Sequence, residues 1–499
     1  MTGVGRILAV LVMAMLPGPA HPAAAAPASW AWGDGPGAVA GVVSRAATGG
    51  RAVSGCRAVS GVRRVEPGAV RGESARPRRV GGRVVEPVGR AGGRRAEGSP
   101  PYGAGGRSVE GPPVRRAGGP GVGVSAGRWT GSWESAPSGA AAALPGAAVR
   151  NVVHLSVGGS AVRVRLSNRF GRGPLRLGAV TVALRAAGPG ALPGTLRVAT
   201  FGGARAVTVP PGEDTVTDPV PLPVRPAADL LVSVATPGDD GPATFHQTAL
   251  QTSYIAPQGA GRAADEDGAA YTTMVGCWYY VTGVDVLGPA TGSVVAFGDS
   301  LTDGNGSTPD TNHRWPDRLA DRLRTDRLGV LNAGISGNRL LRDGAGPSAL
   351  ARLDADAPDR TGVRVLVVLE GINDIKGFPA ADDVSAYAAA YRTLVARAHA
   401  RGVRVVGVTL TPYRGFPAYT AAREAVRRRV NAFIRTGGAF DAVADADAAL
   451  RDPADPTRLR PAYDPGDHLH FNDTGMAKLA DLVLRALHRV TVRGGSAVG

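Results

Sequence analysis

The sequence predicts an α/β domain with a parallel sheet over residues 290–492, preceded by an all-β, jelly-roll-like sandwich over residues 128–289. Two patterns carry this prediction. Short alternating segments separated by glycine and proline turns fill the earlier region, which is typical of β-sandwiches. In the later region apolar strands alternate with helical patterns, which is typical of βαβ units.

The first 26 residues have the pattern of an export signal. Arg6 gives a positive start, residues 7–16 are apolar, and residues 24–26 form a small-residue cleavage site. The apolar run is shorter than the roughly 20 residues that span a bilayer, so we expect cleavage rather than an anchor. No later stretch is long and apolar enough to span. The chain is therefore expected to be secreted, extracellular or associated with the cell surface, without a transmembrane segment.

Residues 27–127 are expected to be disordered, and residues 493–499 to form a flexible tail. Residues 31–127 hold 16 arginines against six acidic residues and hardly an aromatic one, so they cannot bury enough apolar surface to offset the entropy of ordering. Two alternatives are a tether to a surface polymer and translation from a misassigned upstream start. This segment carries most of the net charge of +16, which favours loose contact with polyanions over specific nucleic-acid recognition.

Two cysteines, Cys56 and Cys277, are too few for a disulfide framework, although an exported chain can hold a bridge. The sequence leaves their pairing open.

Alternation marks the strands of the β region. Val162, Val164 and Leu166 point one way, while Arg163 and Arg165 point the other. Comparable runs lie at residues 152–157, 179–184, 206–209, 230–234 and 278–286.

Longer apolar strands mark the α/β region, at residues 294–297, 365–369 and 403–410. Apolar residues recur at helical spacing over residues 384–395 and 476–487, and we interpret both stripes as core-facing sides of helices.

Ser300 is a candidate nucleophile because the strand at residues 294–297 runs directly into the turn Gly298-Asp299-Ser300. The carboxyl edge of a parallel sheet is where α/β proteins bind ligands. A serine hydroxyl needs a base within hydrogen-bond reach and a third group that orients the base. Asp467 and His470 offer both, because an Asp three residues before a His can accept from Nδ1 and leave Nε2 free. His468 is the rival base, but its position next to Asp467 directs the two side chains apart.

Two further strand ends offer hydrogen-bond donors for an oxyanion. Residues 332–338 follow the short apolar pair at 330–331, and a glycine there lets a backbone N–H approach a substrate. Asn373 follows the strand that ends at Glu370, so its amide can donate beside it.

Taken in order, four motifs resemble the four blocks of the SGNH (GDSL-type) hydrolase superfamily. They are Gly298-Asp299-Ser300-Leu301, Ser336-Gly337, Gly371-X-Asn373-Asp374 and Asp467-X-X-His470. The resemblance implies a flavodoxin-like three-layer α/β/α fold and a serine esterase that needs no metal or cofactor.

The same resemblance implies a role for each site residue. Ser300 would be the nucleophile, His470 the general base and acid, and Asp467 the residue that orients it. The backbone N–H groups of Ser300 and Gly337, with the Asn373 amide, would form the oxyanion hole. Asn338 stands where many members carry Asp.

The β region is similar to the accessory domain of a bacterial branch that includes XynE-like esterases. The similar stretches are residues 129–133, 162–168 and 251–254. That branch is linked to deacylation of carbohydrates, which implies a small-molecule or polysaccharide ester as substrate. The plainer interpretation is that the β region shapes the cleft without binding sugar.

Other polar residues have less specific patterns. Asp303, Asn305, Asp310 and His313 follow the nucleophile and could suggest a metal, but polar loop residues near an active-site mouth are commoner than ligands. His154, His246, His399 and His488 lie within strand or helix patterns and are expected to be structural or exposed.

Two other functions use parts of the same sequence. A noncatalytic carbohydrate or cell-surface binding protein would rely on the β region and the basic segment, but it has no need of all four blocks. An acyltransferase would use the same triad with another alcohol in place of water. The motifs do not encode acyl chain length, the alcohol moiety or oligomeric state.

Activity is expected to rise with pH, because a histidine base must be neutral to accept the serine proton. Histidine side chains ordinarily have a pKa of about 6.5, so the rise should fall in that region. The measurement is kcat/KM for an ester across about pH 5 to 8; a flat profile contradicts a histidine base.

Overall fold

The computed structural model describes Cys56 and residues 127–492, with side chains up to residue 490. The predicted export signal, almost all of the segment predicted to be disordered, and the predicted C-terminal tail lie outside the described residues. Among the helices that the structure describes, none is long and apolar enough to cross a membrane.

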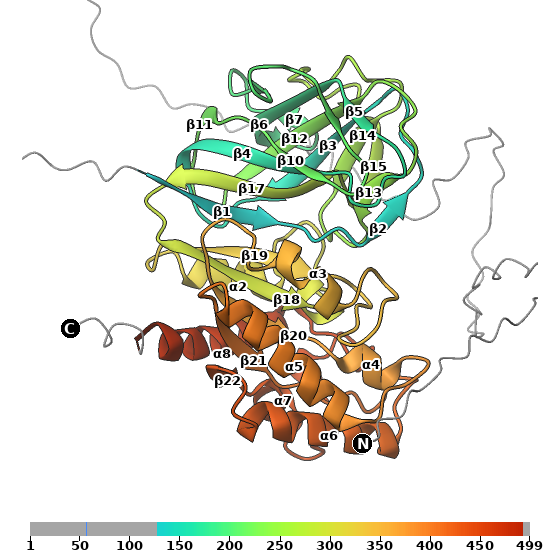
Figure 1. Ribbon diagram of the computed structural model, residues 1–499, viewed down its shortest axis with the longest axis vertical. Coiled ribbons are helices and arrows are strands. Elements are labelled where there is room, and N and C mark those ends of the chain that lie inside the picture. Colours follow the sequence, from blue (N-terminus) through green and yellow to red (C-terminus); the bar gives the residue numbers. More distant parts are fainter. Residues whose placement is uncertain (1–55, 57–126, 493–499) are drawn as a thin grey trace, which may run out of the picture. The chain divides into compact units, whose positions relative to one another are not determined.

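Seventeen strands form the β region of the described chain, and all their ladders are antiparallel (Figure 1). Their bounds are β1 Arg128–Glu134, β2 Gly139–Ala141, β3 Ala147–His154, β4 Gly159–Ser167, β5 Leu175–Leu177, β6 Ala179–Ala187, β7 Gly190–Ala191, β8 Arg197–Ala199, β9 Val207–Val209, β10 Asp214–Val216, β11 Val220–Val224, β12 Asp229–Thr236, β13 Ala243–His246, β14 Ser253–Ala256, β15 Thr273–Val275, β16 Trp278–Tyr279 and β17 Val281–Gly288.

Two large sheets share the core of this region. One has the order β1-β17-β4-β10, with β11 also paired to β4, and the other has the order β15-β14-β3-β12-β6-β7, with β8 paired to β6. Val162, Val164 and Leu166 of β4 are buried, as their alternation predicts. The predicted β region is therefore present, and its jelly-roll description stays a prediction.

One predicted strand is interrupted. The run at residues 278–286 divides into β16 and β17, because Tyr280 has a φ of 61° and leaves the extended conformation. Cys277 precedes this break, is fully buried, and forms a disulfide with Cys56. The structure thereby pairs the two cysteines.

The α/β region contains a five-stranded parallel sheet of order β19-β18-β20-β21-β22. The strands are β18 Gly292–Gly298, β19 Leu328–Gly334, β20 Val363–Leu369, β21 Arg404–Val408 and β22 Ala442–Ala444. The chain order reverses at β18, which makes the carboxyl end of β18 the switch point where such sheets bind ligands.

Eight α-helices and one short 3-10 helix accompany this sheet in the described residues. They are α1 Ser300–Asp303, α2 Trp315–Arg322, α3 Ala349–Asp356, α4 Ile372–Lys376, α5 Val384–His399, α6 Ala421–Thr436, α7 Ala446–Leu450, η1 Pro461–Tyr463 and α8 Asp473–Val492. Helix α8 packs on α2, α7, β21 and β22, while α5 packs on α3, α6 and β21. The three-layer description stays a prediction.

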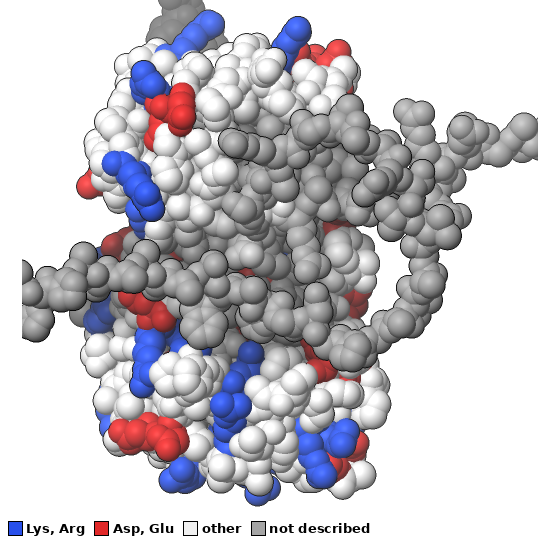
Figure 2. Space-filling view, turned by 90° about the vertical axis from the view of Figure 1, so that its right-hand side faces the viewer, with Lys and Arg blue, Asp and Glu red and all other residues white. Residues whose placement is uncertain are grey.

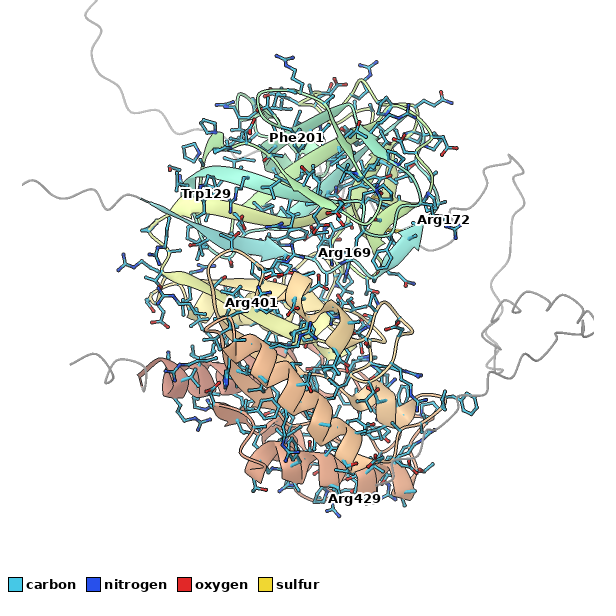
Figure 3. All side chains as sticks on the ribbon, in the orientation of Figure 1. Trp129, Arg169, Arg172, Phe201, Arg401 and Arg429 are labelled. Carbon is cyan, nitrogen blue, oxygen red and sulfur yellow. A yellow bond between two sulfur atoms is a disulfide. The ribbon has the colours of Figure 1, made fainter. Side chains whose placement is uncertain are left out.

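Strand β1 connects the two regions by packing along β19. The Gly131 N–H donates to the Thr361 carbonyl (2.9 Å), and a Cβ on Gly329 would lie 2.1 Å from the Gly131 carbonyl oxygen. The contact therefore requires glycine at position 329. Arg169, labelled in Figure 3, adds an ion pair of 2.7 Å with Asp356 of α3.

Charges on the described surface are mixed. Figure 2 shows basic and acidic side chains interspersed over the face that it draws. The described residues of that face therefore carry charges of both signs rather than one large patch of a single sign.

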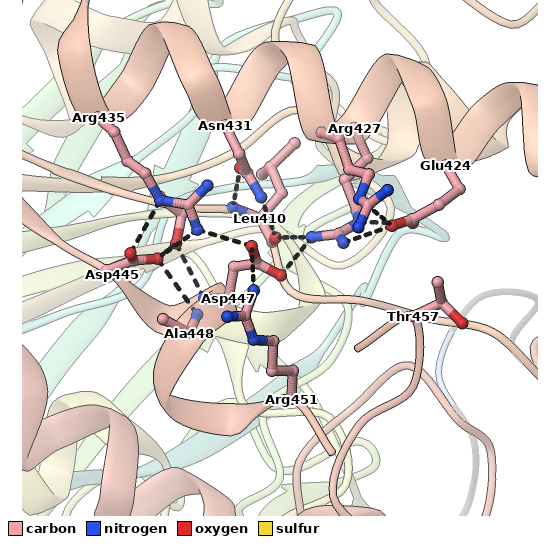
Figure 4. Close-up of polar contacts among 12 residues, drawn as sticks. Leu410, Glu424, Arg427, Asn431, Arg435, Asp445, Asp447, Ala448, Arg451 and Thr457 are labelled. Atoms are coloured by element: carbon pink, nitrogen blue, oxygen red, sulfur yellow. Dashed lines mark hydrogen bonds and ion pairs between the residues drawn. The ribbon is translucent and has the colours of Figure 1, made fainter. Parts of the chain in front are cut away.

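A buried charged network holds α6 against α7 (Figure 4). Arg427 of α6 is 1% exposed and forms ion pairs with Glu424 (2.7 Å) and Asp447 (2.8 Å). It also donates to the carbonyl oxygen of Leu410 (2.6 Å). Asp447 also pairs with Arg435 (2.6 Å), and Glu424 lies 3.6 Å from Arg428. Arg427 is therefore the buried cation that the two carboxylates share.

We expect Arg427→Leu to lower the free energy of unfolding by about 3 kcal/mol, because Glu424 and Asp447 lose the buried cation between them and keep only the more exposed Arg428 and Arg435. The matched control is Arg428→Leu on the same helix. The Arg428 side chain is 65% exposed and lies 3.6 Å from Glu424. Because an exposed ion pair contributes little, its loss should change stability by less than about 1 kcal/mol. Thermal unfolding of both variants measures the difference. Equal melting temperatures would contradict the proposed contribution of Arg427 to stability.

Candidate active site

Ser300 lies at the switch point of the parallel sheet. Strand β18 ends at Gly298, and Asp299 caps helix α1 by accepting from the Leu301 N–H (3.0 Å). A Cβ on Gly298 would lie 2.2 Å from the Leu369 carbonyl oxygen, so only glycine fits where β18 and β20 end together. Ser300 is the first residue of α1, and its backbone N–H has no acceptor within that helix.

His470 and Asp467 complete a hydrogen-bonded chain to Ser300. His470 Nε2 lies 2.9 Å from Ser300 Oγ, and His470 Nδ1 lies 2.5 Å from Asp467 Oδ2. The other Asp467 oxygen accepts from the backbone N–H groups of Leu469 (3.0 Å) and His470 (2.9 Å). The structure therefore brings together the three residues that the sequence predicts as a triad.

The rival histidine faces elsewhere. His468 Nδ1 lies 2.6 Å from Asp464 Oδ2, and His468 has a φ of 63°. Its ring lies against Gly415 rather than Ser300.

Gly337 and Asn373 lie close to each other. The Asn373 side-chain amide donates to the Asn338 carbonyl (2.8 Å), which uses one of its two hydrogens. Gly337 has a φ of 83°, a conformation that glycine adopts without strain. One amide hydrogen of Asn373 thus remains available for an acceptor other than Asn338.

A comparison with protein families matches the part of the chain that contains Ser300 and His470. Residues 296–478 match the model of the GDSL-like Lipase/Acylhydrolase family. We call this segment the GDSL-type domain, after the family whose model it matches. A comparison with curated proteins finds no match.

Solved structures similar to this chain cover 39–40% of it. A GDSL-like lipase from Bacteroides thetaiotaomicron is 18% identical, covers 40% of this chain and 88% of its own, and has a TM-score of 0.32. The M. smegmatis aryl esterase is 18% identical with coverage of 39% and 98% and a TM-score of 0.32. The acetyl xylan esterase AlAXEase is 19% identical with coverage of 39% and 99% and a TM-score of 0.32.

Asp374 ties the two candidate oxyanion segments of the GDSL-type domain together. Its carboxylate accepts from the backbone N–H groups of Leu340 (2.7 Å) and Leu341 (3.0 Å). Asn338 donates to the carbonyl oxygens of Ala345 (2.9 Å) and Pro347 (2.8 Å). A carboxylate has no hydrogen for these two carbonyls, which explains an amide here where many members carry Asp.

Arg352 is a residue of the GDSL-type domain that sequence reasoning missed. It is buried in α3 and donates to the carbonyl oxygens of Gly298 (2.9 Å) and Ala333 (2.8 Å) and to Asn338 Oδ1 (2.9 Å). One guanidinium group thus joins the ends of β18 and β19. A single Arg in a helical pattern carries no sequence signal for this role.

Two buried carboxyl groups, those of Asp299 and Glu370, interact with each other beside the start of α1. Burial raises the pKa of Asp299 to about 6, and burial together with the charge of Asp299 raises that of Glu370 well above its usual value. Burial lowers the pKa of Lys376, against the opposing effects of Asp299 and Asp467.

The polar residues that follow Ser300 do not converge on one point. Asp310 accepts from the Thr252 hydroxyl (2.7 Å), and His313 Nδ1 lies 2.7 Å from Asp473 Oδ2. Within the described ranges, no group of three His, Cys, Asp or Glu residues is placed to hold a metal ion. Asp303 instead contacts His246 of the β region.

Asp467→Asn is expected to lower kcat by about 10⁴-fold, because an amide cannot hold His470 in the required tautomer as a carboxylate does. Burial opposes ionisation of Asp467, but hydrogen bonds from the His470 ring and two backbone N–H groups outweigh it and lower its pKa. The carboxylate stays charged above about pH 4 and is lost only below its ordinary range. A loss of activity above that pH therefore has another source.

The matched control is Asp464→Asn, which alters the neighbouring His468 pair. We expect its kcat to stay within about threefold of the parent, since His468 does not contact Ser300. Equal losses in the two variants, measured on one ester, contradict the distinction between the two pairs.

Proposed function

We propose that this protein is an exported serine esterase that hydrolyses carboxylic esters through an acyl-Ser300 intermediate. The GDSL-type domain supports ester hydrolysis as the class of reaction. The single observation that carries the proposal is the 2.9 Å contact between His470 Nε2 and Ser300 Oγ, with His470 Nδ1 held by Asp467. A base at that distance can take the serine proton.

The proposed reaction has two halves. Ser300 Oγ attacks the ester carbonyl carbon while its proton passes to His470 Nε2. The tetrahedral intermediate collapses, the bond to the alkoxy oxygen breaks, and the leaving alcohol takes that proton. Water then repeats these steps on the acyl-enzyme and releases the acid and free Ser300.

The developing negative charge needs donors fixed in advance. We assign this role to the backbone N–H groups of Ser300 and Gly337 and to the free hydrogen of the Asn373 amide. Removal of one such donor typically costs about 10²–10³ in kcat. The contacts of Asn373, Asp374 and Arg352 support the role, because they limit movement of these segments.

For the substrate we propose a short acyl group, acetyl among them, on a small alcohol or a carbohydrate. The basis is the similarity of the β region to the accessory domain of carbohydrate-deacylating esterases. An acyltransferase remains the second candidate because it uses the same triad.

Export is supported by two features. The N-terminal residues have the pattern of a signal peptide, and the disulfide of Cys56 with Cys277 suits an oxidising compartment.

Ser300→Ala should lower hydrolysis of p-nitrophenyl esters by at least about 10⁴-fold, because no other group replaces the nucleophile. The assay spans acyl chains from acetate to palmitate, and acetate is expected to react fastest. The exposed Ser160 on β4 supplies the control, Ser160→Ala, with parental rates expected. Retained activity in Ser300→Ala would overturn the nucleophile assignment. Transfer to an added alcohol in preference to water would favour the transferase.

A further inference from the structure

His246 and Asp303 form a buried ion pair between the β region and the GDSL-type domain. His246 ends β13 and is 4% exposed, while Asp303 ends α1, three residues after Ser300. His246 Nε2 lies 2.9 Å from Asp303 Oδ1. A residue of the β region thus contacts the helix that begins with the nucleophile.

The second oxygen of Asp303 holds the segment before Gly337. Asp303 Oδ2 accepts from the Ser336 N–H (2.8 Å) and from the Ser336 hydroxyl (2.5 Å). A Cβ on Gly334 would lie 2.2 Å from the Asp303 backbone nitrogen, so α1 and the end of β19 are in close contact. One Asp303 oxygen therefore contacts His246 of the β region, and the other contacts Ser336 of the GDSL-type domain.

Ser336 and Gly337 occupy the centre of a tight turn. The Asn338 N–H donates to the Ile335 carbonyl (3.0 Å), and Gly337 has a φ of 83°. A positive φ at the third position is what a type II turn requires. Because Asp303 fixes the N–H and hydroxyl of Ser336, it restricts the orientation of the next peptide, whose N–H belongs to Gly337.

His246 is itself held from several directions. Nδ1 lies 2.7 Å from the Ala136 carbonyl oxygen, and Nε2 also lies 3.1 Å from that of Thr248. Acceptors face both nitrogens, which only a doubly protonated imidazole satisfies. Burial opposes this charge, but Asp303 and the two carbonyls outweigh it and raise the pKa of His246. The Trp278 ring packs 5.5 Å away.

We propose that His246 is a positioning residue through which the β region fixes the Gly337 N–H, by way of Asp303 and Ser336. The proposal rests on the proposed function, in which that N–H stabilises the oxyanion. Without His246 the buried Asp303 carboxylate loses its counter-charge and must move toward another donor or admit water. Either change weakens its hold on Ser336. The loss acts on a donor used mainly in the transition state, so it lowers kcat more than it changes KM.

The test compares two amide variants of His246 in the full chain. The side-chain nitrogen of Asn reaches about as far as Nδ1, so His246→Asn withdraws the donor from Asp303. We expect kcat on p-nitrophenyl acetate to fall about 10- to 100-fold with KM within about threefold, less than for complete loss of an oxyanion donor. The nitrogen of Gln reaches about as far as Nε2. His246→Gln should therefore recover at least about a third of parental kcat.

His399→Asn is the matched control. His399 pairs with Asp441 (2.8 Å) on the exposed end of α5, and this variant should keep parental kcat and KM. Melting temperatures show which variants fold. Parental kcat in a folded His246→Asn, or equal losses in the Asn and Gln variants, overturns the proposal.

Amide NMR spectra of the labelled full chain separate this proposal from the proposed function. We expect the Ser336 and Gly337 amide signals to shift in His246→Asn and to stay near parental positions in His246→Gln. If the parent hydrolyses no ester, the proposed function fails, and these shifts still report whether His246 positions the segment. Unchanged signals in His246→Asn overturn the positioning role whatever the activity.

Discussion

The active-site edge depends on the close approach of strand ends that only glycine permits. Gly298 lets β18 end against the Leu369 carbonyl of β20, and Gly334 lets β19 end against Asp303 of α1, each with a would-be Cβ contact of 2.2 Å. A larger residue at either position would separate the segments that carry Ser300 and Gly337. The hydrogen-bonded Ser300, His470 and Asp467 and the proposed oxyanion donors can converge only because the backbone itself converges first.

Buried charges then stabilise what the glycines bring together. Arg352 joins the carbonyl ends of β18 and β19, and the Asp303 carboxylate joins α1 to Ser336. Such groups are costly to bury, so each is retained only with a partner. Arg352 contacts Asn338 and lies 3.5 Å from the Asp356 carboxylate, and Asp303 pairs with His246. The geometry of the site therefore depends on charge pairing as well as on packing.

Local sequence patterns predict the triad, but they do not predict contacts between residues that are far apart in the sequence. Ser300, Asp467 and His470 were predictable because each belongs to a short motif and parallel strand ends share one edge. Helix α6 buries Val426, Val430 and Ile434 at helical spacing, but Arg427 lies on the same buried face and no local pattern marks it for burial. The break at Tyr280 depends on a single φ. The sequence does not predict that His246 contacts Asp303, because the two residues are 57 positions apart and only the tertiary structure brings them together.

The β region contributes to the site by packing against the strand that leads into it. Strand β1 packs along β19, and Val330 of β19 donates its N–H to Ser156 Oγ of the β region (2.9 Å). The strand that leads into Ser336 and Gly337 is therefore held along its side by the β region, and its end is held by Asp303 with His246. A strand fixed at both places has little freedom to move its terminal turn. This arrangement assigns the β region a part in site geometry that requires no contact with a sugar.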